Sequence, residues 1–157
     1  MDPKPTAPFC REAAAGSTLN VLGITHRYKA TAAETGGSFS LWEAVFPPGA
    51  GAPPHTHSRE DEAFYVMSGE LLIEIEGEQA PRRLSPGGFF FGARGRRHAV
   101  RNVGDRSARV LVLSAPSCGL DDMFAQLDAA GAAGRPDAGT LTAIAARYGV
   151  TIEPPAG

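Results

Sequence analysis

Hydrophobic and polar positions alternate with a period of two over much of the first 115 residues. The pattern is clearest at 70–76, where Leu71, Ile73 and Ile75 alternate with glutamates. Successive side chains of a strand point to opposite faces, so this run predicts a half-buried strand with one face in water. Comparable runs predict further strands at about 19–30, 38–46, 63–67, 82–84, 89–91, 98–103 and 108–115.

Short stretches of glycine and proline separate these runs, as at 35–37, 47–49 and 86–88. The 19 glycines and 13 prolines are many for 157 residues, which suits tight turns between short strands. Regularly spaced short strands joined by such turns predict an all-β sandwich or barrel.

The hydrophobic period changes in the C-terminal part of the chain. Leu120, Met123, Phe124 and Leu127 recur at helical spacing, and a second stripe contains Leu141, Ile144, Ala145 and Tyr148. Glycines and a proline between 131 and 136 separate the two stripes, and Gly149 ends the second. We therefore expect two C-terminal helices that pack on the outside of the barrel or over part of its mouth.

Composition is that of one ordinary globular domain, with 43% hydrophobic and 20% charged residues. We expect an N-terminal arm at 1–18, a β-barrel at 19–116 and a helical extension at 117–157. A net charge of -2 gives no general attraction for nucleic acid, and no apolar stretch is long enough to span a bilayer. The N-terminus lacks the basic start and apolar run of a secretory signal, so we expect a cytoplasmic location.

Three of the four histidines belong to a pattern that suits a metal site. His55 and His57 stand two apart, Glu62 follows, and His98 comes later in the chain. Residues two apart in a strand share a face, so both histidines point the same way. Imidazole and carboxylate groups are ligands for divalent first-row metals, here Fe, Mn, Ni, Co, Cu or Zn. A three-nitrogen, one-oxygen set leaves one or two positions open on a five- or six-coordinate ion, as catalysis requires.

These residues also carry a resemblance to a known family. Gly49, His55, His57, Glu62 and Gly69 fit the first signature motif of the cupin superfamily, and Gly87, Gly95, His98 and Asn102 fit the second. Ala93 stands where the second motif usually has proline, which puts one turn in question but removes no ligand.

The resemblance implies a jelly-roll (double-stranded β-helix) barrel with a metal held by His55, His57, Glu62 and His98. Glu60 and Asp61 are rival carboxylates, and the family spacing selects Glu62. The string His-Thr-His-Ser-Arg-Glu-Asp-Glu is similar to the quercetin 2,3-dioxygenase-like branch. That branch implies oxidation of a small aromatic or enolisable compound, with Glu62 alternating between ligand and general base. Cupins of this size commonly pair, so we also expect a homodimer.

Two other functions stay open. One is a redox-neutral isomerase or cyclase that uses the metal as a Lewis acid, and the other is a small-molecule-binding cupin without turnover. Candidate substrate-pocket residues are Trp42, Phe64, Val66, Phe91 and Asn102. For most of the aromatic side chains core packing is the favoured interpretation, and for Asn102 it is a hydrogen bond to the backbone.

The remaining candidate residues have plainer interpretations. His26 lies outside both motifs, and we interpret it as a packed or surface histidine. The arginines at 94, 96, 97 and 101 form a solvated basic group, one member of which is a candidate partner for a substrate carboxylate. Cys10 and Cys118 have no neighbouring histidine or cysteine, so we expect free thiols and assign them no role.

Overall fold

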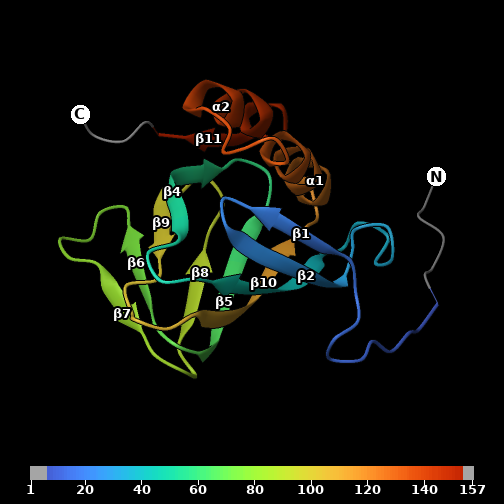
Figure 1. Cartoon of the computed structure of the whole chain (residues 1–157), viewed down its shortest axis with the longest axis horizontal. Helices are drawn as coiled ribbons and strands as arrows, with labels where there is room; N and C mark the ends of the chain where they lie inside the picture. The colour runs from blue at the N-terminus through green and yellow to red at the C-terminus, as the bar shows by residue number, and fades with distance from the viewer. Residues whose placement is uncertain (1–6, 154–157) are drawn as a thin grey trace.

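The computed structural model describes residues 7–153, which form two antiparallel β-sheets and two helices. The spatial order of the six-stranded sheet is β1 (Thr18–Val21), β2 (Ile24–Ala30), β3 (Ser40–Phe46), β10 (Ala108–Ala115), β5 (Asp61–Ser68) and β8 (Phe89–Gly92). The order of the five-stranded sheet is β11 (Val150–Ile152), β4 (Gly51–His57), β9 (His98–Arg101), β6 (Leu71–Ile75) and β7 (Arg82–Leu84). The sheets enclose a barrel (Figure 1), which confirms the predicted jelly-roll architecture with two C-terminal helices.

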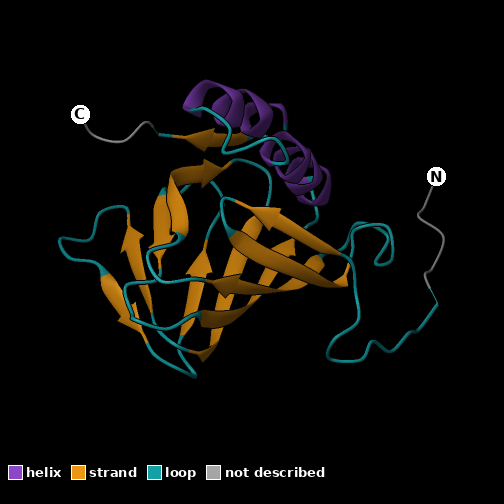
Figure 2. Cartoon of the chain, viewed as in Figure 1, coloured by secondary structure: helices purple, strands orange, loops and turns teal. Residues whose placement is uncertain are grey.

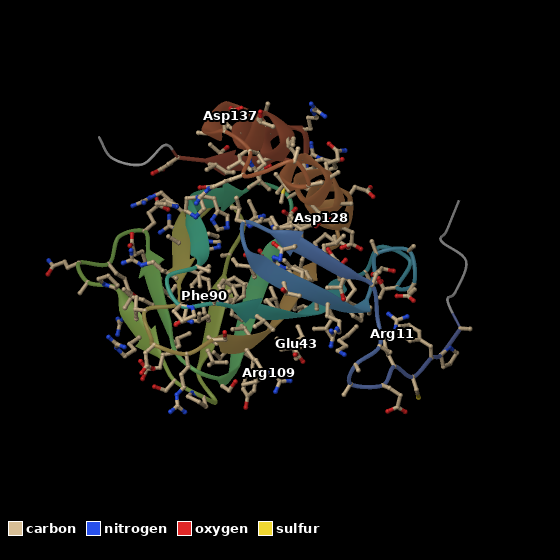
Figure 3. The ribbon with its side chains drawn as sticks, in the orientation of Figure 1. Arg11, Glu43, Phe90, Arg109, Asp128 and Asp137 are labelled. Atoms are coloured by element: carbon tan, nitrogen blue, oxygen red, sulfur yellow. The ribbon has the colours of Figure 1, made fainter. Side chains whose placement is uncertain are left out.

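The core lies between the inner faces of the two sheets. Strand β3 alternates buried and half-buried residues along its whole length, as a sheet with one inner face requires. The register places Val112 of β10 between Trp42 of β3 and Phe64 of β5, and all three side chains are buried. Phe90, labelled in Figure 3, points into the same interior from β8. Burying each of these large side chains stabilises the fold by about 1.5–3 kcal/mol.

Three β-elements differ from the predicted ranges, and one of them is β4, which lies outside every predicted strand. The run at 19–30 is a hairpin and not one strand, because the chain turns at Leu22 (φ 54°) and Gly23 (φ 80°). Two successive residues with positive φ form the two-residue turn that matches the twist of paired strands. Strand β11, which follows the second helix, was not predicted. It pairs with β4 and extends the five-stranded sheet by one strand.

Both helices lie at one end of the barrel (Figures 1 and 2), near β1 and β11. Helix α1 (Leu120–Gly131) is held on the β1–β2 hairpin and its following loop by two carboxylates. Asp128 accepts a hydrogen bond from the backbone N–H of Asn20 (2.7 Å), and Asp121 accepts one from Ala32 (2.7 Å). Helix α2 (Ala138–Arg147) begins at Asp137, whose side chain caps it by accepting from the Thr140 N–H (2.9 Å).

The segment 7–17 precedes β1 and is tied to the loop after β2. Arg11 (labelled in Figure 3) donates two hydrogen bonds to the Glu34 carboxylate, at 2.5 and 3.2 Å. The first six residues of the predicted arm lie outside the described residues. Neither helix within 7–153 has the length and apolar character needed to cross a bilayer.

Candidate metal centre

The four predicted ligands come together inside the barrel. His55 and His57 lie on β4, Glu62 on β5 and His98 on β9, and all four are buried. Within the five-stranded sheet His55 sits directly opposite His98, while Glu62 reaches them from the other sheet. One potential ligand atom from each residue lies within 4.8 Å of the others. The group could therefore hold a metal ion, as is typical of cupins.

The spacing of the donor atoms fits a single coordination sphere. The Glu62 Oε2 atom lies 3.4 Å from the Nε2 atoms of His57 and His98, and 4.0 Å from that of His55. Ligands about 2.0–2.2 Å from one ion are about 3 Å apart at right angles and about 4.2 Å apart across it. Moreover, the Nε2 of His57 is buried and has no hydrogen-bond partner among residues 7–153. A buried nitrogen with its lone pair unused is what a metal ligand requires.

Each imidazole is oriented by a contact at its other nitrogen. The Nδ1 of His55 is 2.7 Å from the Pro53 carbonyl, and that of His98 is 3.3 Å from the Arg96 carbonyl. The Nδ1 of His57 is 2.6 Å from the Glu60 carboxylate, which is 1% exposed. When Nδ1 carries the proton and donates it, Nε2 is left as the free donor to a cation. When neutral, all three rings can therefore adopt the tautomer that suits metal binding.

Glu60 is the principal residue whose role the sequence did not reveal. It was considered as a rival ligand, whereas the structure places it behind His57 as the partner of that ring. It lies three residues after His57 and just before β5, so strand alternation gives no indication of its direction. The carboxylate–histidine pair raises the basicity of a ligating nitrogen and holds its ring in place.

The electrostatics of the cluster are those of a cation site. Burial alone lowers the pKa of His57, but the carboxylates of Glu62 and Glu60 outweigh it and raise that pKa to about 10. Burial likewise raises the pKa of Glu62, yet the charge of His57 and the nearby imidazoles of His55 and His98 hold that pKa well below its usual range. The cluster thus retains a positive charge beside Glu62, and a metal cation would take the place of that proton.

The turn that lacks the usual proline still forms. The Arg96 N–H donates to the Ala93 carbonyl (3.2 Å), and Gly95 between them has φ 76°. A turn with positive φ at its third residue needs glycine there, and the first residue is free to vary. Gly95 also donates to the His57 carbonyl (2.7 Å), so this turn connects the strand carrying His98 to the strand carrying His57. Ala93 in place of proline therefore leaves the site geometry intact.

A small cavity of about 100 Å³ adjoins the cluster. His55, His57 and Glu62 line one side, and Trp42, Phe64 and other apolar residues line the rest. Helix α1 closes it with Met123, Phe124 and Leu127. His98 does not line this space, so the cluster borders the cavity through His55, His57 and Glu62.

The remaining predicted pocket residues lie elsewhere. Phe91 is on the outer face of β8 and is 57% exposed, because Phe90 takes the inward position of that strand. Val66 is buried further along β5. Asn102 is also buried away from the cavity, where its side-chain NH2 donates to the Phe46 and Arg106 carbonyls (2.8 and 2.7 Å). This agrees with the expected backbone role of Asn102.

The basic group around His98 faces solvent. Arg94 pairs with Asp61 (2.8 Å), Arg96 with Glu76 (3.7 Å) and Arg97 with Glu153 (3.6 Å). Arg101 is exposed on β9. None of these arginines lines the cavity beside the ligands.

Comparison with known sequences gives the family context. Residues 42–114 match the Cupin_2 family, described as the Cupin domain. Polyketide synthase CurC from Streptomyces cyaneus is 34% identical over 86 residues, which cover 55% of this chain and 53% of that protein. Tetracenomycin polyketide synthase protein TcmJ from Streptomyces glaucescens is 33% identical over 69 residues, 44% of this chain and 45% of the relative. The chain thus spans about half the length of these curated relatives.

Solved structures give the same fold. KdgF from Halomonas sp. superposes with a TM-score of 0.62 and 28% identity, covering 73% of this chain and 99% of that one. An RmlC-like cupin from Shewanella frigidimarina matches with a TM-score of 0.60 at 16% identity, over 72% of this chain and 95% of its own. The family match and these structures support the cupin superfamily for this chain. None of the comparisons bears on the quercetin dioxygenase-like branch.

Proposed function

We propose that this cupin-fold chain is a metal-dependent enzyme that removes a proton from a small enolisable or aromatic compound. One observation carries the proposal: three imidazoles and a carboxylate converge on one point, and that point adjoins a largely apolar cavity. A site built only to stabilise the barrel has no need of a cavity beside its ligands.

The residues of the site have different roles in this reaction. A divalent metal at this site would supply Lewis acidity, lowering the pKa of a hydroxyl or of a C–H beside a carbonyl. His55, His57 and His98 hold their Nε2 atoms toward the common point, and the mostly apolar lining of the cavity favours an apolar substrate. Glu62 borders both the cluster and the cavity, so its carboxylate is the base within reach of a substrate proton.

The fate of the deprotonated substrate separates two reactions. In the first, O2 accepts electrons from it and the substrate is oxidised, as the resemblance to quercetin dioxygenase-like cupins implies. In the second, the deprotonated carbon attacks a carbonyl carbon of the same molecule: a C–C bond forms, the C=O π bond opens onto its oxygen, and that oxygen takes the proton that Glu62 removed, so no oxidant is used. The relatives named as polyketide synthase proteins favour the second, since polyketide chains carry acidic C–H groups between carbonyls.

The test is turnover of enolisable substrates with and without O2. Protein purified without added metal is analysed for bound metal, then loaded with Fe, Mn or Zn and supplied with phenols and 1,3-diketones. Oxygen consumption that follows substrate loss supports the oxygenase, and O2-independent conversion supports the isomerase or cyclase. Glu62→Gln is the matched variant, because it keeps the volume of the side chain and removes the base. Stoichiometric metal binding without conversion of any substrate would overturn the enzymatic proposal and leave a binding protein.

A further inference from the structure

His26 is a buried polar residue that the metal cluster does not use. It lies on the inner face of β2, is 6% exposed and lines the same cavity as His55, His57 and Glu62. Its ring packs against Phe124 of α1 (centroids 4.8 Å apart) and near Trp42 of β3 (6.2 Å). The aromatic contacts hold the ring in one place, so its polar edge has a defined direction.

One nitrogen of this ring is enclosed without a hydrogen bond. The Nδ1 of His26 is buried and, within the part of the chain that the structure describes, has no partner. An unpartnered N–H costs more than an unpartnered lone pair, so the ring proton belongs on Nε2. Burial also lowers the pKa of His26 to about 4, so the ring is neutral at physiological pH. The residue is thus a neutral N–H donor.

The other residues that line the cavity limit which substrate groups can bind beside His26. Among the described residues the lining contains no lysine or arginine, and its one carboxylate, Glu62, belongs to the metal cluster. At the His26 end, away from the metal cluster, a carboxylate or phosphate group on a substrate would be buried without a counter-charge, which is strongly unfavourable. The volume of about 100 Å³ is of the same order as the roughly 150 Å³ cavity that admits benzene. The cavity therefore suits a small uncharged ring or chain.

We propose that His26 is a substrate-binding residue whose Nε2–H donates to a carbonyl or hydroxyl oxygen remote from the metal centre. This inference rests on the proposed function and narrows its substrate class. The substrate would be small, uncharged and largely apolar, with one acidic group at the metal and a second oxygen at His26. The same reasoning disfavours a substrate that carries a carboxylate or phosphate at its His26 end.

The experiment uses cyclopentanone as the probe and methylenecyclopentane, in which =CH2 replaces =O, as the control. Both dissociation constants are measured by NMR on zinc-loaded protein and on chelator-treated protein. The same samples give the ¹⁵N resonances of the His26 ring. We expect the proton on Nε2, and a shift of the Nε2 resonance as cyclopentanone saturates. The measured quantity is the ratio of the affinity for cyclopentanone to the affinity for methylenecyclopentane. This ratio should be about 5-fold or more higher in wild type than in His26→Phe.

His26→Phe keeps an aromatic ring between Phe124 and Trp42 and removes the donor. His26→Leu is the second variant, in case the larger ring disturbs packing, and the amide spectrum of each checks its fold. A proton found on Nδ1, a His26 signal unmoved at saturation, or an unchanged ratio of affinities in a folded variant would each overturn the inference. Failure of the proposed function is separate, because it appears as absence of metal binding or of turnover while the cyclopentanone result on chelator-treated protein still stands.

Discussion

At the scale of single residues, the site depends on which atom each side chain leaves free. The three histidines differ in the partner at Nδ1, and only His57 has a charged one, Glu60. A carboxylate there strengthens the electron-donating Nε2 on the far side of the ring and fixes the ring's rotation. Glu60 therefore acts on the metal through His57 without contacting it.

We predict that Glu60→Gln weakens metal binding by about 10- to 100-fold with all four ligands intact. The variant keeps the shape of the side chain and removes the charge that supports His57. The measurement is a competition titration of zinc against a chromophoric chelator. Glu74→Gln is the matched control, because Glu74 is an exposed carboxylate on β6 and the same change there should leave affinity unaltered. Equal affinities for wild type and Glu60→Gln would show that the contact does not tune the site.

The residue scale also shows what the sequence could reveal about the site. The pairing of His55 with His57 could be predicted because strands place alternate residues on one face, and spacing added Glu62 and His98. The residues that line the cavity were harder to predict. Phe90 and Phe91 are adjacent and chemically identical, and only the register of β8 decides which one points inward. His26 follows the same alternation as Ile24 and Tyr28, so its burial was predictable, but its place in the cavity was not.

At the scale of elements, the local hydrophobic pattern predicted most of the regular strands. It did not predict elements whose presence or bounds depend on pairing with distant strands. The bounds predicted for Ala108–Ala115 agree with β10, since an alternating buried strand has a strong signal. The β1–β2 hairpin was hidden because its turn begins at Leu22, a residue that continues the hydrophobic pattern and takes positive φ. Strand β11 is three residues long, and it exists because it pairs with β4 after α2 has turned the chain back.

The connection between the N-terminal segment and the β2–β3 loop gives a pH-dependent prediction. Hydrogen bonds from Arg11 and then from Thr31 lower the pKa of Glu34 to about 2. A carboxyl group with a depressed folded-state pKa contributes stability above its unfolded value, near 4.5, and loses that contribution as pH falls toward 2. The difference in free energy of unfolding between wild type and Glu34→Gln should therefore shrink across this range. Urea titrations at several pH values measure it, and a difference that stays constant from pH 5 to pH 2.5 would contradict the assigned ion pair.

At the scale of the whole molecule, a metal ion would join the two sheets. His55, His57 and His98 belong to the five-stranded sheet and Glu62 to the six-stranded one, so the ion would bridge the barrel wall to wall. Binding to the folded state alone stabilises it by about 2.7 kcal/mol when the free metal is 100 times its Kd. We predict a rise in Tm of about 5–10 °C on adding zinc, reversed by chelator. Calorimetry measures it, and His98→Ala should show little or none of the rise.

The outer face of the six-stranded sheet suggests how two copies would meet. A sheet face in water normally carries polar side chains, yet here one row across four strands contains Leu41, Leu113, Ala63 and Phe91. The next row places Tyr65 beside Phe89. The side chains of Tyr65, Phe89 and Phe91 are 47–61% exposed. The Glu43–Arg109 pair on the same face, both labelled in Figure 3, and the Asp61–Arg94 pair each balance their charges. These two pairs therefore add no net charge to the apolar rows that a second copy would meet.

We accordingly predict a homodimer through this face. Replacing Phe89 and Phe91 together by serine should raise the dimer dissociation constant at least 100-fold, because a symmetric interface loses four aromatic side chains at about 1 kcal/mol each and about 2.7 kcal/mol corresponds to 100-fold. Sedimentation equilibrium over a range of concentrations measures the constant, and metal binding shows that the variant is folded. Val103→Ser is the control, since Val103 is an exposed apolar residue beyond β9 and away from these rows. If the wild-type chain stays monomeric at high micromolar concentration, the prediction of a homodimer through this face is wrong.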